Sequence, residues 1–294
     1  MTAFGRATIF LTFLLIVIQT SSVFSQRIRN DLQQLNLSKN VNTVNETTYK
    51  AIFKNGNVIK GKKIISSEDK NKIIVFNKEG YKISETALSG DDDAIEKLEY
   101  SYDNKMNIVG ISYYTYYEGY DILVYKRKYN YVYEGDKIIT EQLVDEYGAT
   151  EHKAFYKYDK KNNLSEKTWR KPDSTLIARF FTNYDDNRNL IDDVTYDSTG
   201  AEQIRIKYKI GPTNRISEQE IFKKKKFDVR YKFFYDQYEN VIEVDWSTEN
   251  GVIFTKWVFN YEYDDRNWIR KITYKNDKPI KITERKIFYN LKSD

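Results

Sequence analysis

The chain of 294 residues contains no cysteine, one histidine and only three prolines. Without cysteine it can form neither a disulfide framework nor an acylated lipoprotein anchor, so its stability must come from packing. The lone His152 leaves too few ligands for a zinc site of the histidine type. Three consecutive acidic residues, Asp91 to Asp93, lack the alternating spacing of a calcium loop. The sequence therefore predicts no metal site and no cofactor.

The sequence also lacks a large excess of either basic or acidic residues. The chain carries 48 basic and 43 acidic residues, for a net charge of +5, and the two signs are dispersed. Such a balance is typical of solvated strand faces, whereas a protein that tracks phosphates shows a basic stripe. We therefore expect no nucleic-acid partner.

A long apolar run is absent beyond the first 25 residues. Arg6 precedes an apolar stretch from Ile9 to Ile18, and Val23 and Ser25 stand at the small-residue sites of a cleavage signal. This pattern predicts a signal peptide over residues 1–25, cleaved before Gln26. The apolar stretch is too short to span a bilayer, which needs about 20 residues. We expect a secreted or periplasmic protein with no stable membrane insertion after cleavage.

Aromatic residues are abundant, with 26 tyrosines and 16 phenylalanines. Many belong to a pattern of Tyr-Asp followed by Asn and an apolar residue, which recurs at a spacing of about 26 residues. The copies are Tyr102-Asp103 with Asn107, Tyr158-Asp159 with Asn163, Tyr184-Asp185 with Asn189, Tyr235-Asp236 with Asn240, and Tyr263-Asp264 with Asn267. Repetition at such a period indicates one supersecondary unit stacked many times, so these residues are structural anchors of the repeat.

Each repeat has the signature of a β-hairpin. Apolar residues alternate with charged ones between the anchors, as in the segment 228–235, and a second turn lies half a repeat after each Tyr-Asp pair. This alternation predicts strands with one buried face, and two turns per period predict two strands. We expect a hairpin-repeat domain over residues 47–294, preceded by a polar arm or cap over residues 26–46.

These hairpins predict an all-β fold. Consecutive hairpins would form one long antiparallel sheet, and accumulated strand twist bends a sheet of more than about ten strands. We therefore predict a curled or solenoid-like sheet. Closure of the sheet and the oligomeric state stay open, because an unpaired terminal strand could join another copy.

The Tyr-Asp, Asn and apolar pattern resembles the YD repeat of the rearrangement-hotspot (RHS) family, from about Tyr102 to Tyr289. The resemblance implies a spiralling sheet of hairpins that can enclose a hollow shell. Large members carry an Asp-Pro-x-Gly proteolytic motif and a C-terminal toxin, neither of which is visible in this sequence. The chain is thus similar to short exported bacterial members that lack the autoprotease core and the toxin.

Residues that would carry catalysis are few. His152 has no evident nucleophile partner, and an imidazole packed in a strand explains it more simply. Acidic pairs such as Asp192-Asp193 and Glu243 with Asp245 leave a carboxylate-dependent hydrolase of cell-surface polysaccharide as an alternative. We expect no enzyme and assign no catalytic residue.

The best candidate for binding is a group of tyrosines in one hairpin, which could stack on sugar rings or anchor a protein. The group comprises Tyr113, Tyr114, Tyr116, Tyr117 and Tyr120. A rim that merely tolerates exposed rings is the other interpretation. The sequence thus favours an exported, non-enzymatic β-repeat scaffold or binding protein for an envelope glycan or a protein. A shell-like or immunity partner of another exported protein is a further alternative.

Overall fold

The computed structural model describes residues 30–38, 40–64, 71–117 and 120–290. They form one antiparallel sheet of 19 strands and one short helix, α2 (Asp31–Gln34). The predicted signal peptide lies outside the described residues. Within the described ranges, no helix is long and apolar enough to cross a membrane.

The strands follow one another as hairpins, and almost every strand pairs with its neighbours in sequence. The first nine are β1 (Val41–Lys54), β2 (Asn57–Lys63), β3 (Asn71–Phe76), β4 (Lys82–Leu88), β5 (Ala94–Tyr102), β6 (Ile108–Tyr117), β7 (Tyr120–Glu134), β8 (Lys137–Asp145) and β9 (Thr150–Tyr158). The other ten are β10 (Leu164–Arg170), β11 (Leu176–Tyr184), β12 (Leu190–Asp197), β13 (Glu202–Ile210), β14 (Ile216–Lys223), β15 (Lys226–Tyr235), β16 (Val241–Ser247), β17 (Ile253–Asp264), β18 (Asn267–Lys275) and β19 (Lys278–Tyr289).

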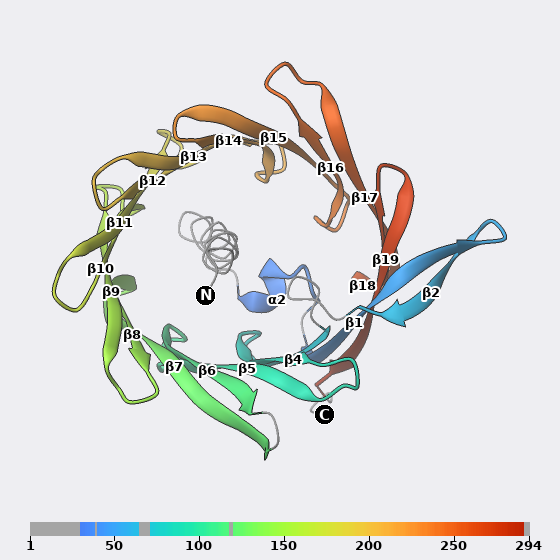
Figure 1. Cartoon of the computed structure of the whole chain (residues 1–294), viewed down its shortest axis with the longest axis horizontal. Coiled ribbons are helices and arrows are strands. Elements are labelled where there is room, and N and C mark those ends of the chain that lie inside the picture. The colour runs from blue at the N-terminus through green and yellow to red at the C-terminus, as the bar shows by residue number, and fades with distance from the viewer. Residues whose placement is uncertain (1–29, 39, 65–70, 118–119, 291–294) are drawn as a thin grey trace, which may run out of the picture.

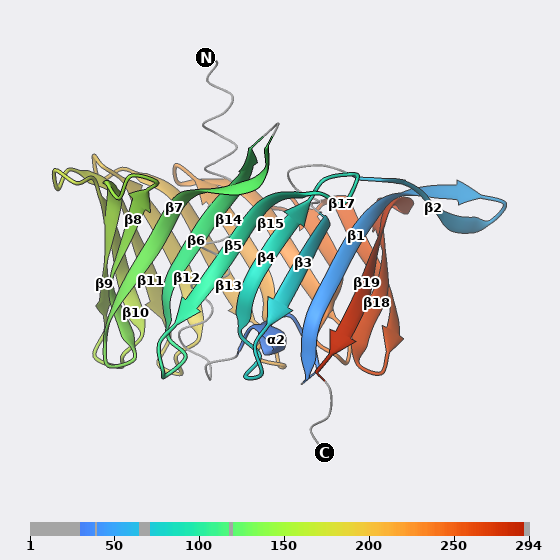
Figure 2. The same cartoon turned by 90° about the horizontal axis from the view of Figure 1, so that it is seen from below.

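The sheet closes into a barrel of 18 strands (Figure 1). Strand β1 pairs on one side with β19 and on the other with β3, while β2 pairs with β1 alone. Strand β2 and the end of β1 therefore form a ribbon that projects from the wall (Figure 2). The all-β prediction is confirmed, but the predicted curled or solenoid-like sheet is wrong, because the sheet closes on itself.

Closure depends on residues that the sequence analysis assigned to the polar arm. Strand β1 begins at Val41, and Val41 and Val44 are fully buried. The apolar positions of this strand are irregular in the sequence, so its propensity is hard to recognise. Its pairing on both sides nevertheless satisfies the backbone groups of the first and last strands, which a curled sheet would leave exposed.

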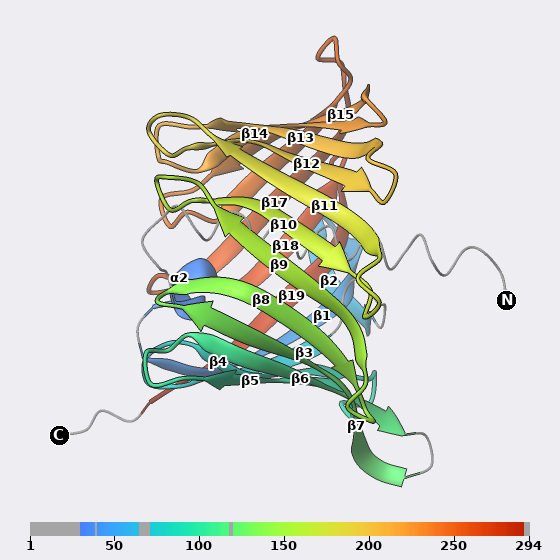
Figure 3. The same cartoon turned by 90° about the vertical axis from the view of Figure 1, so that its left-hand side faces the viewer.

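The barrel is wide enough to enclose a lumen. With a strand spacing of about 4.8 Å and a tilt of about 40°, eighteen strands give a backbone diameter of about 36 Å. The strands are visibly tilted (Figure 3). Side chains alone do not fill a barrel of 16 to 18 strands.

The Tyr-Asp turns all lie at one end of the barrel, the end that contains α2 (Figure 2). In these turns the aspartate bonds its own loop. One oxygen of Asp159 accepts the backbone N–H groups of Lys161 and Asn163, and the other accepts the Asn163 side chain. Asp103 does the same with Lys105 and Asn107. The carboxylate thus fixes a five-residue loop whose fourth residue has positive φ, as at Asn162.

The other copies vary this arrangement. Asp185 accepts both groups of Asn189, whereas Asp236 accepts the backbone of Asn240, whose side chain bonds Tyr263 instead. At Asp264 the turn is one residue shorter, because Asn267 follows Asp264 by three residues and pairs with it directly.

The repeat tyrosines connect neighbouring hairpins. The hydroxyls of Tyr102, Tyr158 and Tyr235 donate to the backbone carbonyls of Lys82, Ile138 and Ile216, at 2.7 to 2.9 Å. Each acceptor is the first or second residue of a strand about 20 residues earlier in the chain, namely β4, β8 and β14. The Tyr263 hydroxyl donates to the Asp236 carboxylate. Tyr184 differs, since its buried hydroxyl has no partner within the described residues.

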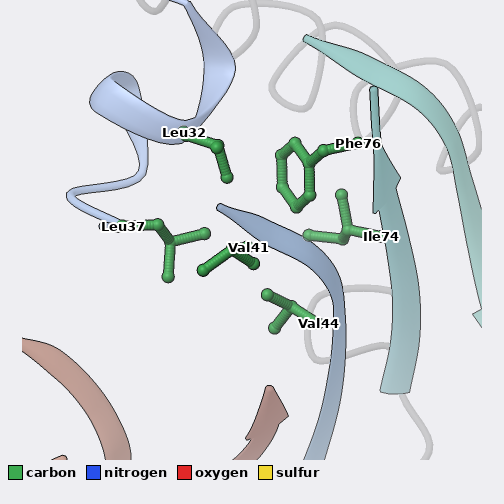
Figure 4. Close-up of a cluster of buried hydrophobic side chains, with 6 residues drawn as sticks. All are labelled: Leu32, Leu37, Val41, Val44, Ile74 and Phe76. Carbon is green, nitrogen blue, oxygen red and sulfur yellow. The ribbon is translucent and has the colours of Figure 1, made fainter. Parts of the chain in front are cut away.

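The segment Asn30–Ser38, called here the crossing segment, lies inside the ring at the α2 end (Figure 1). Leu32 and Leu37 pack with Val41, Val44, Ile74 and Phe76 in one buried cluster (Figure 4). Hydrogen bonds attach the segment to the β3–β4, β15–β16 and β17–β18 turns. The Leu32 N–H donates to the carbonyl of Gly80, the Asn36 side chain to that of Glu239, and the Ser38 N–H to the Asn267 side chain. It therefore lies across part of this end of the barrel.

Replacing Tyr158 and Tyr184 by phenylalanine tests the tyrosine contacts. Tyr158→Phe removes a hydrogen bond to a buried carbonyl, so we expect a loss of about 1 kcal/mol in the free energy of unfolding. Tyr184→Phe removes a buried hydroxyl without a partner, so we expect no loss or a small gain. Urea unfolding of both variants measures the difference. Equal destabilisation of the two would contradict the assigned roles.

Candidate ligand-binding lumen

The two faces of the barrel wall are identified by the crossing segment. Because this segment lies inside the ring and packs on Val44, Ile74 and Phe76, these residues face the lumen. Directly paired residues share a face of a sheet, so the strand register extends this assignment around the barrel. Large rings on the lumenal face include Tyr100, Tyr129, Tyr131, Tyr156, Phe180, Tyr208, Tyr231, Phe233, Phe259 and Tyr261.

All four tryptophans also face the lumen, and each contacts another ring. Trp169 packs edge-on against Phe180 at 4.9 Å, and Trp246 lies 5.2 Å from Tyr231 and 5.9 Å from Trp257. Trp268 lies 5.7 Å from Tyr261. The lumen wall therefore carries separate groups of contacting rings, one around Trp169, one around Trp246 and one around Trp268.

The outer face carries ion pairs between adjacent strands. The pairs include Lys157–Glu166, Arg179–Glu166, Arg205–Asp192, Lys209–Glu218, Arg230–Glu220 and Lys256–Glu243, at 2.5 to 2.9 Å. They occupy the middle of the strands and not only the loops. The wall thus has rings inside and charges outside.

His152 lies in the ring layer. It stacks on Trp169 at 5.5 Å and lies 6.4 Å from Tyr129. Burial disfavours the imidazolium and lowers the pKa of His152, although Glu141 partly opposes this effect. Its Nε2 has no hydrogen-bond partner in the described residues. No hydroxyl or thiol is paired with it there, so the geometry is that of a packed ring.

A charged group lies on the lumenal face of β1, β18 and β19. Arg285 Nε donates to Glu46 at 2.9 Å, and its guanidinium lies 3.5 Å above the centre of the Trp268 ring. The Lys271 ammonium lies 4.9 Å from the same ring. Burial, together with Arg285 and the neighbouring lysines, lowers the pKa of Lys271 to about 8. Burial opposes ionisation of Glu46, yet Arg285, Lys72 and Lys271 hold its pKa below the ordinary value.

Two further carboxylates reach lumenal hydroxyls. Glu141 accepts a hydrogen bond from the Tyr156 hydroxyl and forms an ion pair with Lys167 at 3.0 Å. Asp193 accepts from Tyr208 at 2.8 Å and from Thr182 at 2.6 Å. These contacts place acceptors and donors among the rings, as in sites that bind polar ligands with apolar faces.

The acidic pairs proposed for a hydrolase do not converge. Asp192 and Asp193 lie on opposite faces, because Asp192 pairs with Arg205 outside while Asp193 bonds Tyr208 inside. Glu243 and Asp245 both face outward, beside Lys256. Among the described residues, no group of three or more His, Asp or Glu could hold a metal ion.

The tyrosines proposed as a binding site are divided between the faces. Tyr113 faces the lumen under Arg127, whose guanidinium lies 5.3 Å from its ring centre. Tyr114 faces outward and donates to Glu99. Tyr116 is half-buried on β6, and the side chains of Tyr117 and Tyr120 lie outside the described residues. An open depression of about 410 Å³ adjoins Tyr113, with Arg127, Asp145 and Tyr147 in its lining.

Comparisons with known proteins were made by family model, by sequence and by structure. No family model matches the chain. No curated protein matches it either. Solved structures match the chain at low sequence identity.

A porin-like protein from Bacteroides uniformis is 8% identical, with a TM-score of 0.47, over 84% of this chain and 98% of that one. A porin-like protein from Bacteroides vulgatus is 12% identical, with a TM-score of 0.32, over 86% and 99%. The TcdB2-TccC3-TEV structure is 10% identical, with a TM-score of 0.30, over 81% of this chain but only 15% of that one. All three scores are below 0.5, so the fold is established by the chain's own strand pairing.

Sequence reasoning missed the group around Arg285. Glu46 and Arg285 are 239 residues apart and meet only because the barrel closes. No local signal marks the group, because other repeats also place polar residues three positions after the apolar residue that starts the strand, as at Lys167, Asp193 and Gln219.

The single histidine gives a direct test of the lumenal environment. We expect the pKa of His152 to lie below 6.5 in the folded protein, because burial disfavours its charged form. The neutral form then stabilises the fold above pH 6.5, and this stability is lost as the pH falls below that value. Proton NMR titration of the one imidazole measures the pKa. A His152→Gln variant should lose less stability between pH 7 and pH 5. An imidazole titrating at or above 6.5 would refute the assignment.

Proposed function

We propose that this protein is an exported, non-enzymatic barrel that binds a glycan in its ring-lined lumen. The observation that carries the proposal is the placement of large rings, including all four tryptophans, on the lumenal face. Ring faces stack on the apolar faces of sugars, and carboxylates such as Glu141 and Asp193 accept bonds from sugar hydroxyls. Export rests on the signal peptide predicted over residues 1–25.

The outer face supports a barrel surrounded by water. A barrel that spans a membrane presents to lipid an apolar band about 25 Å tall, with aromatic girdles at both edges. Here the middle of the outer face carries ion pairs such as Arg205–Asp192 and Arg230–Glu220. Charged residues on a lipid-facing wall cost about 2 to 4 kcal/mol each at the midplane of a bilayer.

A protein partner is the second candidate, favoured by two apolar tips. Phe53 at the tip of the β1–β2 ribbon is 66% exposed, and Val252 in the β16–β17 turn is 64% exposed. Ile253 and Phe254 beside it are about half exposed. Both tips project from the end of the barrel opposite α2 (Figure 2). Exposed apolar residues grouped at a rim are typical of protein contacts.

Glycan binding can be followed by tryptophan fluorescence, since all four tryptophans line the lumen. We expect an envelope glycan to change the emission of the purified full-length protein, and Trp246→Leu to weaken its binding about tenfold through lost ring contact. Phe234→Leu, which changes an outward-facing ring, is the matched control and should bind normally. No response across a panel of neutral and acidic glycans would contradict the proposal. Capture of a peptide by the rim tips would support the protein partner instead.

The water-facing outer wall predicts behaviour with lipid. We expect the protein to remain in the aqueous fraction when it is floated with phosphatidylcholine vesicles, with the same circular dichroism as in buffer. Arg205→Leu and Arg230→Leu remove outward charges and should not cause insertion, because the remaining pairs still oppose it. Flotation of the wild-type barrel with the vesicles would contradict the proposal that its outer wall faces water.

A further inference from the structure

The charged residues on the lumenal face of β1, β18 and β19 form a compact group, called here the Arg285 cluster. It consists of Glu46, Trp268, Lys271, Thr273 and Arg285. Glu46 and Arg285 are direct partners across the β1–β19 pairing. Lys271 pairs with Thr283, two residues before Arg285 on β19, so the three charged groups share one patch of the wall.

Arg285 has unused hydrogen-bonding capacity. A guanidinium carries five N–H donors in a fixed fork. Its Nε donates to Glu46, while its buried Nη1 has no partner in the described part of the chain. The side chain is only 8% exposed, so ordinary surface water does not explain this donor. A buried donor without an acceptor is costly, and acceptors from a ligand relieve such a cost.

Lys271 and Thr273 add further donors beside Arg285. Lys271 makes no hydrogen bond or ion pair with any described residue, and its ammonium is held over Trp268. The Thr273 hydroxyl is fully buried, also without a partner in the described ranges. Both residues lie on the lumenal face of β18 and are two positions apart. Three unsatisfied donor groups of three side chains thus line adjacent strands.

The charges around the cluster do not cancel. Glu46 is the carboxylate that faces Arg285, Lys271 and Lys72. Lys281 on β19 also faces Lys271. The nearby Glu85 is already held by Lys72 at 3.4 Å and by Lys82 at 3.1 Å. Arg285, Lys271 and Lys72 therefore share the carboxylates of Glu46 and Glu85, and Glu85 is also held by Lys82, so an excess of positive charge remains that favours an anion there.

We propose that the Arg285 cluster binds an anionic group, a carboxylate or a phosphate ester, carried by the lumenal ligand. This inference rests on the proposed function, and it makes the glycan an acidic one. The Arg285 fork and the Lys271 ammonium supply charge-assisted hydrogen bonds to such a group. Trp268 holds both cations in place through its ring face.

A matched pair of lysine variants isolates the cluster. Lys271→Gln removes the lumenal charge, and Lys207→Gln removes a lysine that lies at the same 4.9 Å from a ring, Phe222, on the outer face. Arg285→Gln would leave Glu46 buried without its partner, so it is a poorer choice because the barrel could fail to close. Thermal melts without ligand should show that both lysine variants fold.

Trigalacturonate and mannose 6-phosphate are the acidic probes, with methyl-esterified trigalacturonate and mannose as their neutral counterparts. We expect an acidic probe to bind at least about tenfold more tightly than its neutral counterpart, and Lys271→Gln to abolish most of that preference. The carboxylate and phosphate arms show which anion the site takes. Lys207→Gln should leave the preference unchanged.

Sulfate tests the cluster without any glycan. It should raise the melting temperature of the wild type and of Lys207→Gln more than that of Lys271→Gln at equal ionic strength. Sulfate is fully ionised from pH 7 to pH 9, so its binding to the wild type should weaken over this range as Lys271 loses its proton. The charged groups that face Lys271 are Glu46, Lys72, Lys281 and Arg285. The Lys271→Gln variant should show a flatter profile.

The outcomes separate the two proposals. Equal binding of neutral and acidic glycans by wild type and Lys271→Gln would keep the lumenal glycan site and overturn the anion site. Absence of glycan binding, together with a sulfate effect that needs Lys271, would keep the anion site and refute the glycan. A sulfate effect that is identical in all three proteins would overturn the anion site in either case.

Discussion

The pairing of β1 with both β3 and β19 is the constraint on which the rest of the structure depends. Each hairpin needs only its neighbours, so the repeats alone would build an open, curling sheet. Strand β1 occupies the gap between the last strand and the third, and it satisfies both edges at once. Closure also creates an inside. The lumen, the crossing segment bound across one end and the Glu46–Arg285 contact all follow from this single strand.

The sidedness of the wall follows from strand alternation. Side chains alternate between faces, so a register error of one residue would exchange the rings and the ion pairs. Three devices oppose such an error. The aspartates at the turns fix loop length, the bulges that follow them restart each strand in the same phase, and the tyrosine hydroxyls connect one hairpin to the carbonyls of the preceding one. The repeated residues therefore act on register. Where Ile210-Gly211 stands in place of a Tyr-Asp pair, the backbone keeps the same turn, because the Gly211 N–H donates to the Arg215 carbonyl at 2.7 Å.

The sequence predicted the elements better than their assembly. The spacing of Tyr158-Asp159 and its equivalents marks the turns at one end, and the alternation around Val229 marks a strand face. Both are local signals. Closure depends on Val41 and Val44, whose segment lacks clear alternation, and on partners more than 200 residues away. The candidate site has the same difficulty. Periodicity indicates that Tyr113 and Tyr114 point to opposite faces but not which face is inside. Lys271 can be recognised as a binding residue only once Arg285 and Trp268 are known to lie beside it. The resemblance to RHS repeats stays a prediction.

The cations on the lumenal wall illustrate how a ring layer can hold charge. Lys167 lies 4.9 Å from the Tyr156 ring and 5.2 Å from the Trp169 ring, and Lys275 lies 5.3 Å from the Trp257 ring. Ring faces attract these groups, and long side chains keep their ammonium groups toward water. Lys167 also has Glu141 as a counter-ion at 3.0 Å. Lys271 shares the ring contact but has no ion pair within the described chain, and Arg285 beside it uses only one of its donors on Glu46. Lys275 is exposed and can be hydrated, whereas Lys271 is partly buried without a counter-ion and Arg285 keeps a buried Nη1 without an acceptor, so an anion from outside the chain explains this cluster better than packing alone.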